Sequence, residues 1–178
     1  NKFYASEHPL ILGEYHQAFK NSNFLADFGF TQGYKNTSDT KKGGEKSHFF
    51  SKFTKNFNTN DNADSTLSLS IQDTSNDKYL KLYKIDSNLV DYSSDVLENS
   101  LNFSHQKKDL FFGLNASVYE TLSEDYNDKY EYILPEITID KNLVANNKIG
   151  NLDLQTSLKT HNYDCLLYTS DAADEKRC

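Results

Sequence analysis

The side chains best suited to chemistry in this sequence are its histidines, and their spacing predicts no catalytic or metal site. They are His8, His16, His48, His105 and His161. No histidine is followed four residues later by a second one, which is the spacing that places two zinc ligands on one face of a helix. His16 follows Glu14 by two positions, so the two share one face of a strand. They are either polar lining of a wet interior or ordinary strand residues.

Two further motifs resemble ligand sites without completing them. The segment Ser123-Glu-Asp-Tyr-Asn-Asp128 carries the oxygen ligands that Ca²⁺ prefers, but it lacks the glycine and the final glutamate of an EF-hand loop. The pair Gly43-Gly44 is not directly followed by the Lys-Ser or Lys-Thr of a phosphate-binding loop. We therefore expect no cofactor, no metal site and no enzymatic activity, and we interpret 123–128 as a solvated loop.

Composition argues against two classes of protein. A net charge of −7 and a pI near 5.2, without a basic patch interleaved with aromatic residues, argue against a nucleic-acid-binding protein. The mean hydropathy is −0.75, and no run approaches the roughly 18 apolar residues that a membrane helix needs. A polar chain can still cross a membrane as strands, because half of each strand in an outer-membrane barrel faces water.

Alternation of apolar and polar residues at period two predicts eight β-strands. In one of the clearest, Leu110, Phe112 and Leu114 interleave with Gly113 and Asn115. Pro135 lies inside another strand and predicts a bulge there, because proline cannot donate a ladder hydrogen bond. The expected strands are 10–20, 22–34, 47–57, 64–73, 95–106, 109–120, 129–140 and 149–161.

The connections between these strands alternate short and long. This parity is typical of outer-membrane barrels, which carry short turns on one side of the membrane and longer loops on the other. Residues 77–85 form either another strand or a helical turn, and we place them outside the membrane to keep the parity. The expected connections are Asn21, 35–46, 58–62, 74–94, 107–108, 121–128 and 141–148.

We therefore predict an all-β antiparallel meander, a partial transmembrane outer-membrane β-barrel that is an open, curled sheet over this sequence. A charge near the midplane of the lipid face costs about 2–4 kcal/mol, so charged positions are expected on the inner, polar face. The predicted lumen-facing residues are Glu14, His16, Asp27, Thr31, Ser68, Ser70, Gln72, Glu98, Ser100, Asn102, Asn115, Ser117, Asp153, Gln155 and Lys159. The predicted lipid-facing residues, beside Leu97, are Phe24, Phe28, Phe30, Leu67, Leu69, Ile71, Leu101, Phe103, Leu110, Phe112, Leu114, Val118, Leu152, Leu154 and Leu158.

The two ends of the sequence suggest an internal piece of a longer protein. The first residue is Asn1 rather than Met, and no leader peptide follows it. The last residues, 165–178, break the strand pattern and contain both cysteines and the single arginine, Arg177. They resemble the translation of an adapter used in sequencing libraries. We expect a barrel domain over 1–164 and a non-native tail over 165–178.

Several motifs, in order along the chain, resemble a known barrel family. The run His8-Pro-Leu-Ile-Leu-Gly-Glu-Tyr-His-Gln-Ala-Phe-Lys-Asn21 is similar to the second strand and turn of the LptD (OstA) family of lipopolysaccharide-assembly outer-membrane proteins, with His16 in place of an arginine. The segment Ser75-Asn-Asp-Lys-Tyr-Leu-Lys-Leu-Tyr83 resembles the next signature of that family. Leu97-x-x-Ser-x-x-Phe103 and Tyr132-Ile-Leu-Pro-Glu-Ile137 resemble elements that follow it.

The resemblance implies transport rather than catalysis. In that family the barrel inserts lipopolysaccharide into the outer leaflet of the bacterial outer membrane, and a lipoprotein plug occupies the lumen. Periplasmic bridge proteins deliver the lipid through an N-terminal domain, which this sequence does not include. Sugars pass through the lumen, and acyl chains leave through a seam between the first and last strands.

Two other interpretations stay open. Eight strands equal the smallest closed barrel, so a small porin-like channel is the first alternative. A soluble β-sandwich or adhesin module is the second. Dependence on detergent and heat-modifiable gel mobility separate a barrel from a sandwich.

Overall fold

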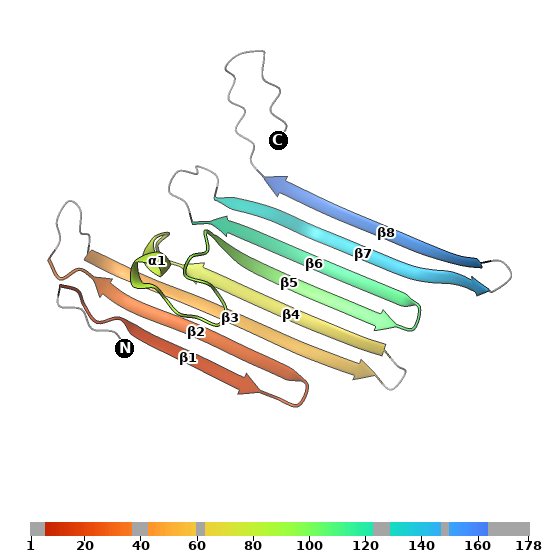
Figure 1. The fold of residues 1–178 in the computed structure, drawn as a ribbon, viewed down its shortest axis with the longest axis horizontal. Helices are drawn as coiled ribbons and strands as arrows, with labels where there is room; N and C mark the ends of the chain where they lie inside the picture. The colour runs from red at the N-terminus through yellow and green to blue at the C-terminus, as the bar shows by residue number, and fades with distance from the viewer. Residues whose placement is uncertain (1–5, 37–42, 60–62, 123–128, 147–149, 164–178) are drawn as a thin grey trace, which may run out of the picture.

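The computed structural model describes residues 6–36, 43–59, 63–122, 129–146 and 150–163. Over these residues the chain forms one antiparallel sheet whose eight strands follow one another in sequence order (Figure 1). This confirms the predicted meander. The strands are β1 (Ile11–Ala18), β2 (Ser22–Gly33), β3 (Gly43–Thr59), β4 (Ala63–Thr74), β5 (Val96–Lys107), β6 (Leu110–Thr121), β7 (Tyr130–Asn146) and β8 (Gly150–Tyr163).

The parity of the connections is also as predicted. The short connections lie at one end of the sheet, and the longer ones lie at the other (Figure 1). Two strands are longer than the sequence pattern indicates: β3 begins at Gly43 rather than at 47, and β7 continues to Asn146 rather than 140. Both extensions are paired with a neighbouring strand, Gly43 with Gly33 and Asn146 with Gly150. Backbone hydrogen bonding therefore continues where the apolar–polar alternation fades.

The register of pairing assigns every strand residue to one of two faces, because residues directly opposite each other share a face. Asp27 pairs with Glu14 and Phe50, and Ser70 pairs with Lys52 and Ser100. The face that carries these residues is called the polar face below. The opposite face is called the apolar face and includes Phe24, Phe28, Leu69, Leu101 and Leu158.

A bulge in β7 changes the phase of its alternation. Asn115 and Ser117 of β6 face Glu136 and Ile133, so two residues, Leu134 and Pro135, stand opposite one residue of β6. The register with β8 shifts at the same point. The predicted bulge at Pro135 is therefore present, and the Leu134–Pro135 peptide bond is cis. The bulge places Ile133 and Glu136 on the same face, although three positions separate them.

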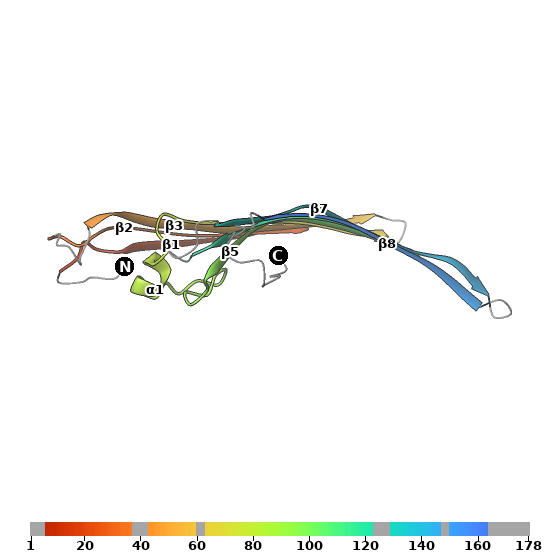
Figure 2. The same cartoon turned by 90° about the horizontal axis from the view of Figure 1, so that it is seen from above.

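The hydrophobic core lies on the polar face, at the end with the longer connections. Residues 75–95, called the cap below, fold back over this face and contain the short helix α1 (Tyr79–Tyr83) (Figure 2). The uncertain segment 77–85 is thus a helical turn and not a strand. No helix in the described part of the chain is long and apolar enough to span a membrane. The buried cluster consists of Leu10, Phe50, Tyr79, Leu80, Tyr83, Ile85, Val90, Leu97 and Leu122.

The prediction that Leu97 faces lipid is wrong, because Leu97 belongs to this cluster. Leu97 is fully buried among the side chains of the cap. Backbone pairing between β4 and β5 ends at Ser70 and Ser100. Beyond that point the side chains of Gln72 and Asn99 bond to the opposing backbone. The cap packs where the two strands separate, and Leu97 is covered by it.

Candidate functional site

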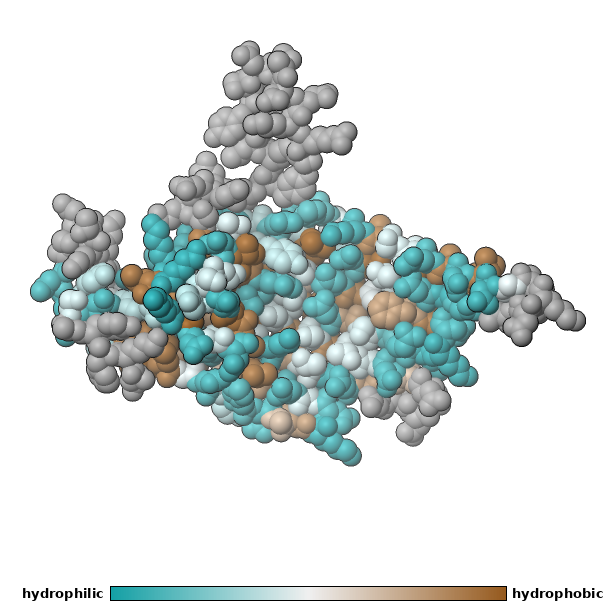
Figure 3. Space-filling model, in the orientation of Figure 1, coloured by the Kyte–Doolittle hydropathy of each residue, from teal (hydrophilic) through white to brown (hydrophobic). Residues whose placement is uncertain are grey.

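The polar face is the candidate functional site, and the structure brings together on it all the residues predicted to face a lumen. Pairing and alternation place every one of them on the side of the sheet that carries Asp27. They place the predicted lipid-facing set on the other side, and Leu97 shares this register although it is buried in the cluster that includes the cap. Figure 3 views the polar face, where hydrophilic colours predominate around the cap and across the strands.

The apolar face leaves large hydrophobic side chains in the open. Phe28 is 49% exposed and Leu158 is 59% exposed. The charged residues that pairing assigns to this face lie toward the ends of the strands and include Lys55, Asp73 and Lys107. The centre of the face is an apolar band without charge. A contiguous apolar surface of this size is typical of a face that contacts lipid or another protein.

The cap buries one end of the polar face. Four residues predicted to line an open lumen are instead almost inaccessible: Asp27, Thr31, Ser100 and Ser117. Asp27 and Thr31 lie at the end where the cap packs. The sequence pattern predicted which face of the sheet they are on, but it could not predict that the cap would bury them. Glu14 and His16 on the neighbouring strand remain exposed, with Nε2 of His16 2.5 Å from Oε1 of Glu14.

A buried polar network joins the cap to the sheet. Nε2 of His48 lies 3.4 Å from Oδ1 of Asp27, and Nδ1 of His48 lies 3.3 Å from the Tyr79 hydroxyl. The imidazole also stacks on Phe50, with ring centroids 4.7 Å apart. With Nε2 protonated, the ring donates to the carboxylate and accepts from the hydroxyl. Every group of the network is then satisfied away from water.

Two polar contacts to residues outside the cap, and one within it, hold the cap at its edges. Nδ2 of Asn88 donates to Oε1 of Glu14 at 2.9 Å. Nζ of Lys129, the residue before β7, donates to Oδ2 of Asp77 at 2.6 Å. Within the segment, Lys81 pairs with Asp95. The cap is therefore a docked element of the fold and not a free loop.

The pKa values of three residues in the cap or in contact with it are shifted from their ordinary values. Burial, helped by the charge of Asp27, raises the pKa of Tyr79 well above that of a free tyrosine, so its hydroxyl stays protonated. The hydrogen bond to Asp77 raises the pKa of Lys129 above its ordinary value. Hydrogen bonds from the backbone and hydroxyl of Ser93 lower the pKa of Asp91.

The buried position of His48 is suited to holding the cap against the sheet. A general base must come within hydrogen-bond reach of its substrate, but the side chain of His48 is fully buried. Within the described residues no three His, Cys, Asp or Glu side chains are grouped so that they could hold a metal ion. The acidic segment 123–128 and the tail 165–178 lie outside the described residues.

Sequence reasoning missed the residues on which the cap is built. His48, Phe50 and Tyr79 were not among the predicted site residues, although Phe50 is fully buried. A signal for the cap was present in the sequence of β3. Phe49 and Phe50 are adjacent and so lie on opposite faces, which puts one large aromatic residue, Phe50, on an otherwise polar face. Such a residue indicates that something apolar covers it.

The chain was also compared with known proteins. No protein-family model, no curated protein and no solved structure matches it. Any functional assignment therefore depends on the two faces of the sheet and on the cap.

Proposed function

We propose that this chain is part of a bacterial outer-membrane β-barrel that inserts lipopolysaccharide into the outer leaflet. The apolar face contacts the bilayer, and the polar face lines a lumen that also receives a lipoprotein plug. Periplasmic bridge proteins deliver the lipid to this barrel. The motifs that resemble the LptD family support this choice of barrel.

The observation that carries the proposal is the division of eight meander strands into a polar and an apolar face. The central strands β2, β4, β5 and β6 have 12 residues each, and about 9–11 tilted residues cross a bilayer. Tyr130 and Tyr132 lie on the apolar face near the strand end, with ring centroids 6.3 Å apart. Aromatic residues at that height are typical of the interfacial girdle of a barrel.

Depletion of the full-length protein in its host cell tests the function. We expect the protein to fractionate with the outer membrane and newly made lipopolysaccharide to fail to reach the cell surface when it is removed. Normal delivery of lipopolysaccharide during depletion would refute the translocon. Recovery of the protein in the soluble fraction would refute the membrane barrel and favour the sandwich or adhesin.

One feature favours a porin-like channel as the second candidate. The cap narrows the space above the polar face, as a constriction does in a diffusion channel. Conductance of the purified protein in planar bilayers separates the two. Steady, open conductance together with unchanged lipopolysaccharide delivery is the result that the channel predicts.

A further inference from the structure

A second feature of the polar face lies far from the cap, around Phe111 of β6. Pairing places Phe111 opposite Gln106 and Asp140, so its aromatic ring projects from the polar side of the sheet. The ring covers Gly113: a Cβ atom on that glycine would lie 3.2 Å from Cε1 and 3.3 Å from Cζ of Phe111. The ring therefore lies against the backbone of Gly113 and also borders two hollows of the polar face.

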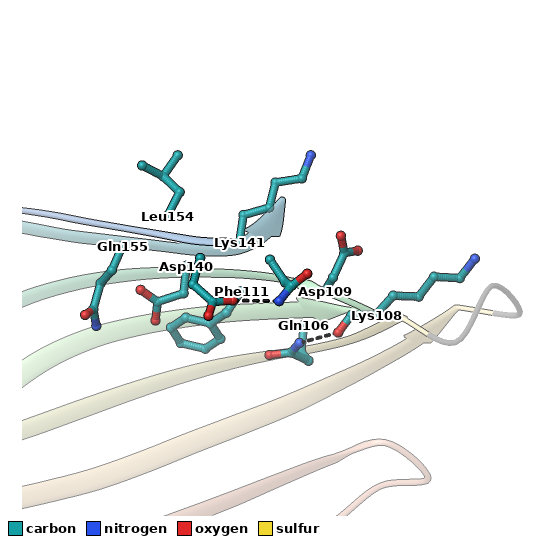
Figure 4. A pocket seen from close by; sticks show the side chains of 10 residues that line it. Gln106, Lys108, Asp109, Phe111, Asp140, Lys141, Leu154 and Gln155 are labelled. Atoms are coloured by element: carbon teal, nitrogen blue, oxygen red, sulfur yellow. Dashed lines mark hydrogen bonds between the residues drawn. The ribbon is translucent and has the colours of Figure 1, made fainter. Parts of the chain in front are cut away.

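Phe111 forms the wall between two hollows on the polar face. One, of about 240 Å³, includes Ser68, Asn102 and Asn115 in its lining. The other, of about 380 Å³, includes Gln106 and Gln155. Figure 4 shows Phe111, Asp140 and Gln155 projecting to one side of the strands, while Lys141 and Leu154 project to the other. The ring is thus an apolar platform surrounded by hydrogen-bonding side chains.

The polar groups beside the platform are only partly satisfied. Nδ2 of Asn115 donates to Oε2 of Glu136 at 3.2 Å, and Nδ2 of Asn142 donates to Oδ1 of Asp153 at 2.7 Å. Oδ1 of Asp140 is buried and has no hydrogen-bond donor within the described part of the chain. Asp140 also lines the larger hollow, where a ligand hydroxyl can donate to its carboxylate.

We propose that Phe111 and the polar side chains around it form a binding subsite for an uncharged sugar ring. The C–H face of a pyranose carries partial positive charge and complements the negative face of an aromatic ring. Its hydroxyl groups donate to Asp140 and bond with the neighbouring amides. The four carboxylates that line the two hollows (Asp109, Glu136, Asp140 and Asp153) outnumber the two lysines (Lys108 and Lys141), and this excess of negative charge disfavours a phosphorylated sugar. The inference goes beyond the proposed function, because it holds for a channel as well as for a lipid translocon.

Saturation-transfer NMR on the purified full-length protein in detergent micelles tests the subsite, with maltotriose as the uncharged probe and glucose 6-phosphate as the anionic one. We expect maltotriose to bind and glucose 6-phosphate to bind more weakly. Phe111→Leu keeps an apolar cover over Gly113 but removes the π face, and it should weaken maltotriose binding about fivefold to tenfold. Phe111→Tyr keeps the aromatic ring and should bind maltotriose about as well as the wild type.

The matched control is Phe112→Leu, the same change one residue later on the apolar face, and it should leave the affinity unchanged. Asp140→Asn is a second test that alters no volume, and it should also weaken binding. Equal binding by wild type and the Phe111→Leu and Asp140→Asn variants, or no maltotriose binding by the folded wild type, would overturn the subsite. Stronger binding of glucose 6-phosphate would overturn its preference for uncharged sugars. Lipopolysaccharide delivery is measured separately, so the subsite and the translocon can fail independently.

Discussion

The hydroxyl of Tyr79 lies 3.3 Å from Nδ1 of His48, and this contact joins the first residue of α1 to the polar face of β3. Because both side chains are buried, the hydrogen bond has no competition from solvent. Tyr79→Phe removes only the hydroxyl and should weaken docking of the cap by about 1 kcal/mol. Hydrogen exchange of the amides in 76–92 measures this. Tyr132→Phe, on the apolar face, is the control and should leave that exchange unchanged.

The two neighbouring phenylalanines of β3 allow a direct comparison of its faces. Phe50→Ala removes a fully buried ring beneath the cap and should destabilise the folded protein by about 3–5 kcal/mol. Phe49→Ala, on the apolar face where the ring is 43% exposed, should cost clearly less. Urea unfolding of the purified protein in detergent measures both changes. A larger loss for Phe49→Ala would contradict the position of the core.

Adjacent residues of β4 test which face meets lipid. Leu69→Lys introduces a charge into the apolar band and should cost about 2–4 kcal/mol on folding into a bilayer. Ser68→Lys places the same charge on the polar face, opposite the uncharged Thr54 and Asn102, and should be tolerated. Folding into lipid vesicles, followed by heat-modifiable gel mobility, reports the difference. Equal tolerance of the two variants would count against a membrane-spanning sheet.

The contact between Asp77 and Lys129 predicts a pH dependence at the edge of the cap. Asp77 raises the pKa of Lys129 above the ordinary value of 10.5. A group whose pKa is raised in the folded state contributes its full stabilisation below the unfolded value. That contribution is then lost as the pH rises through the folded value. The cap should therefore loosen at this contact only in strongly alkaline solution.

NMR titration of the Lys129 side chain checks this contact. Asp77→Asn should lower the pKa of Lys129 toward that of a free lysine. Asp95→Asn is the matched control, since Asp95 pairs with Lys81, and it should leave the Lys129 titration in place. A Lys129 pKa that does not change with Asp77→Asn would rule out this ion pair in solution.

The strands and their faces could be predicted because alternation is a local property of the sequence. Leu67, Leu69 and Ile71 interleave with serine and glutamine, and pairing with β3 and β5 puts them on the face that this pattern implies. Because alternation is local, it could not predict where β3 begins or where β7 ends. At Gly43 and Asn146 a neighbouring strand provides hydrogen bonds that no periodic pattern records.

The cap could not be predicted because its contacts are distant in sequence. Tyr79 meets His48 across 31 positions, and Asn88 meets Glu14 across 74. Helix α1 has only five residues, too few for its own periodicity to indicate where it docks. Phe50 and Phe111 are large aromatic residues on a polar face, and such residues indicate local packing on that face. The first lies under the cap, and the second covers Gly113.

The bulge in β7, where two residues stand opposite one, also limits which insertions and deletions this sheet can accept. Removing either Leu134 or Pro135 would leave one residue opposite each neighbour and preserve the orientation of both halves of the strand. A second extra residue is Leu143, because Asn142 and Val144 pair with the adjacent residues Asp153 and Leu152 of β8. Removing a residue of β7 outside these two bulges would turn one part of the strand over. Length variation among related chains should therefore be concentrated at these two positions of the strand.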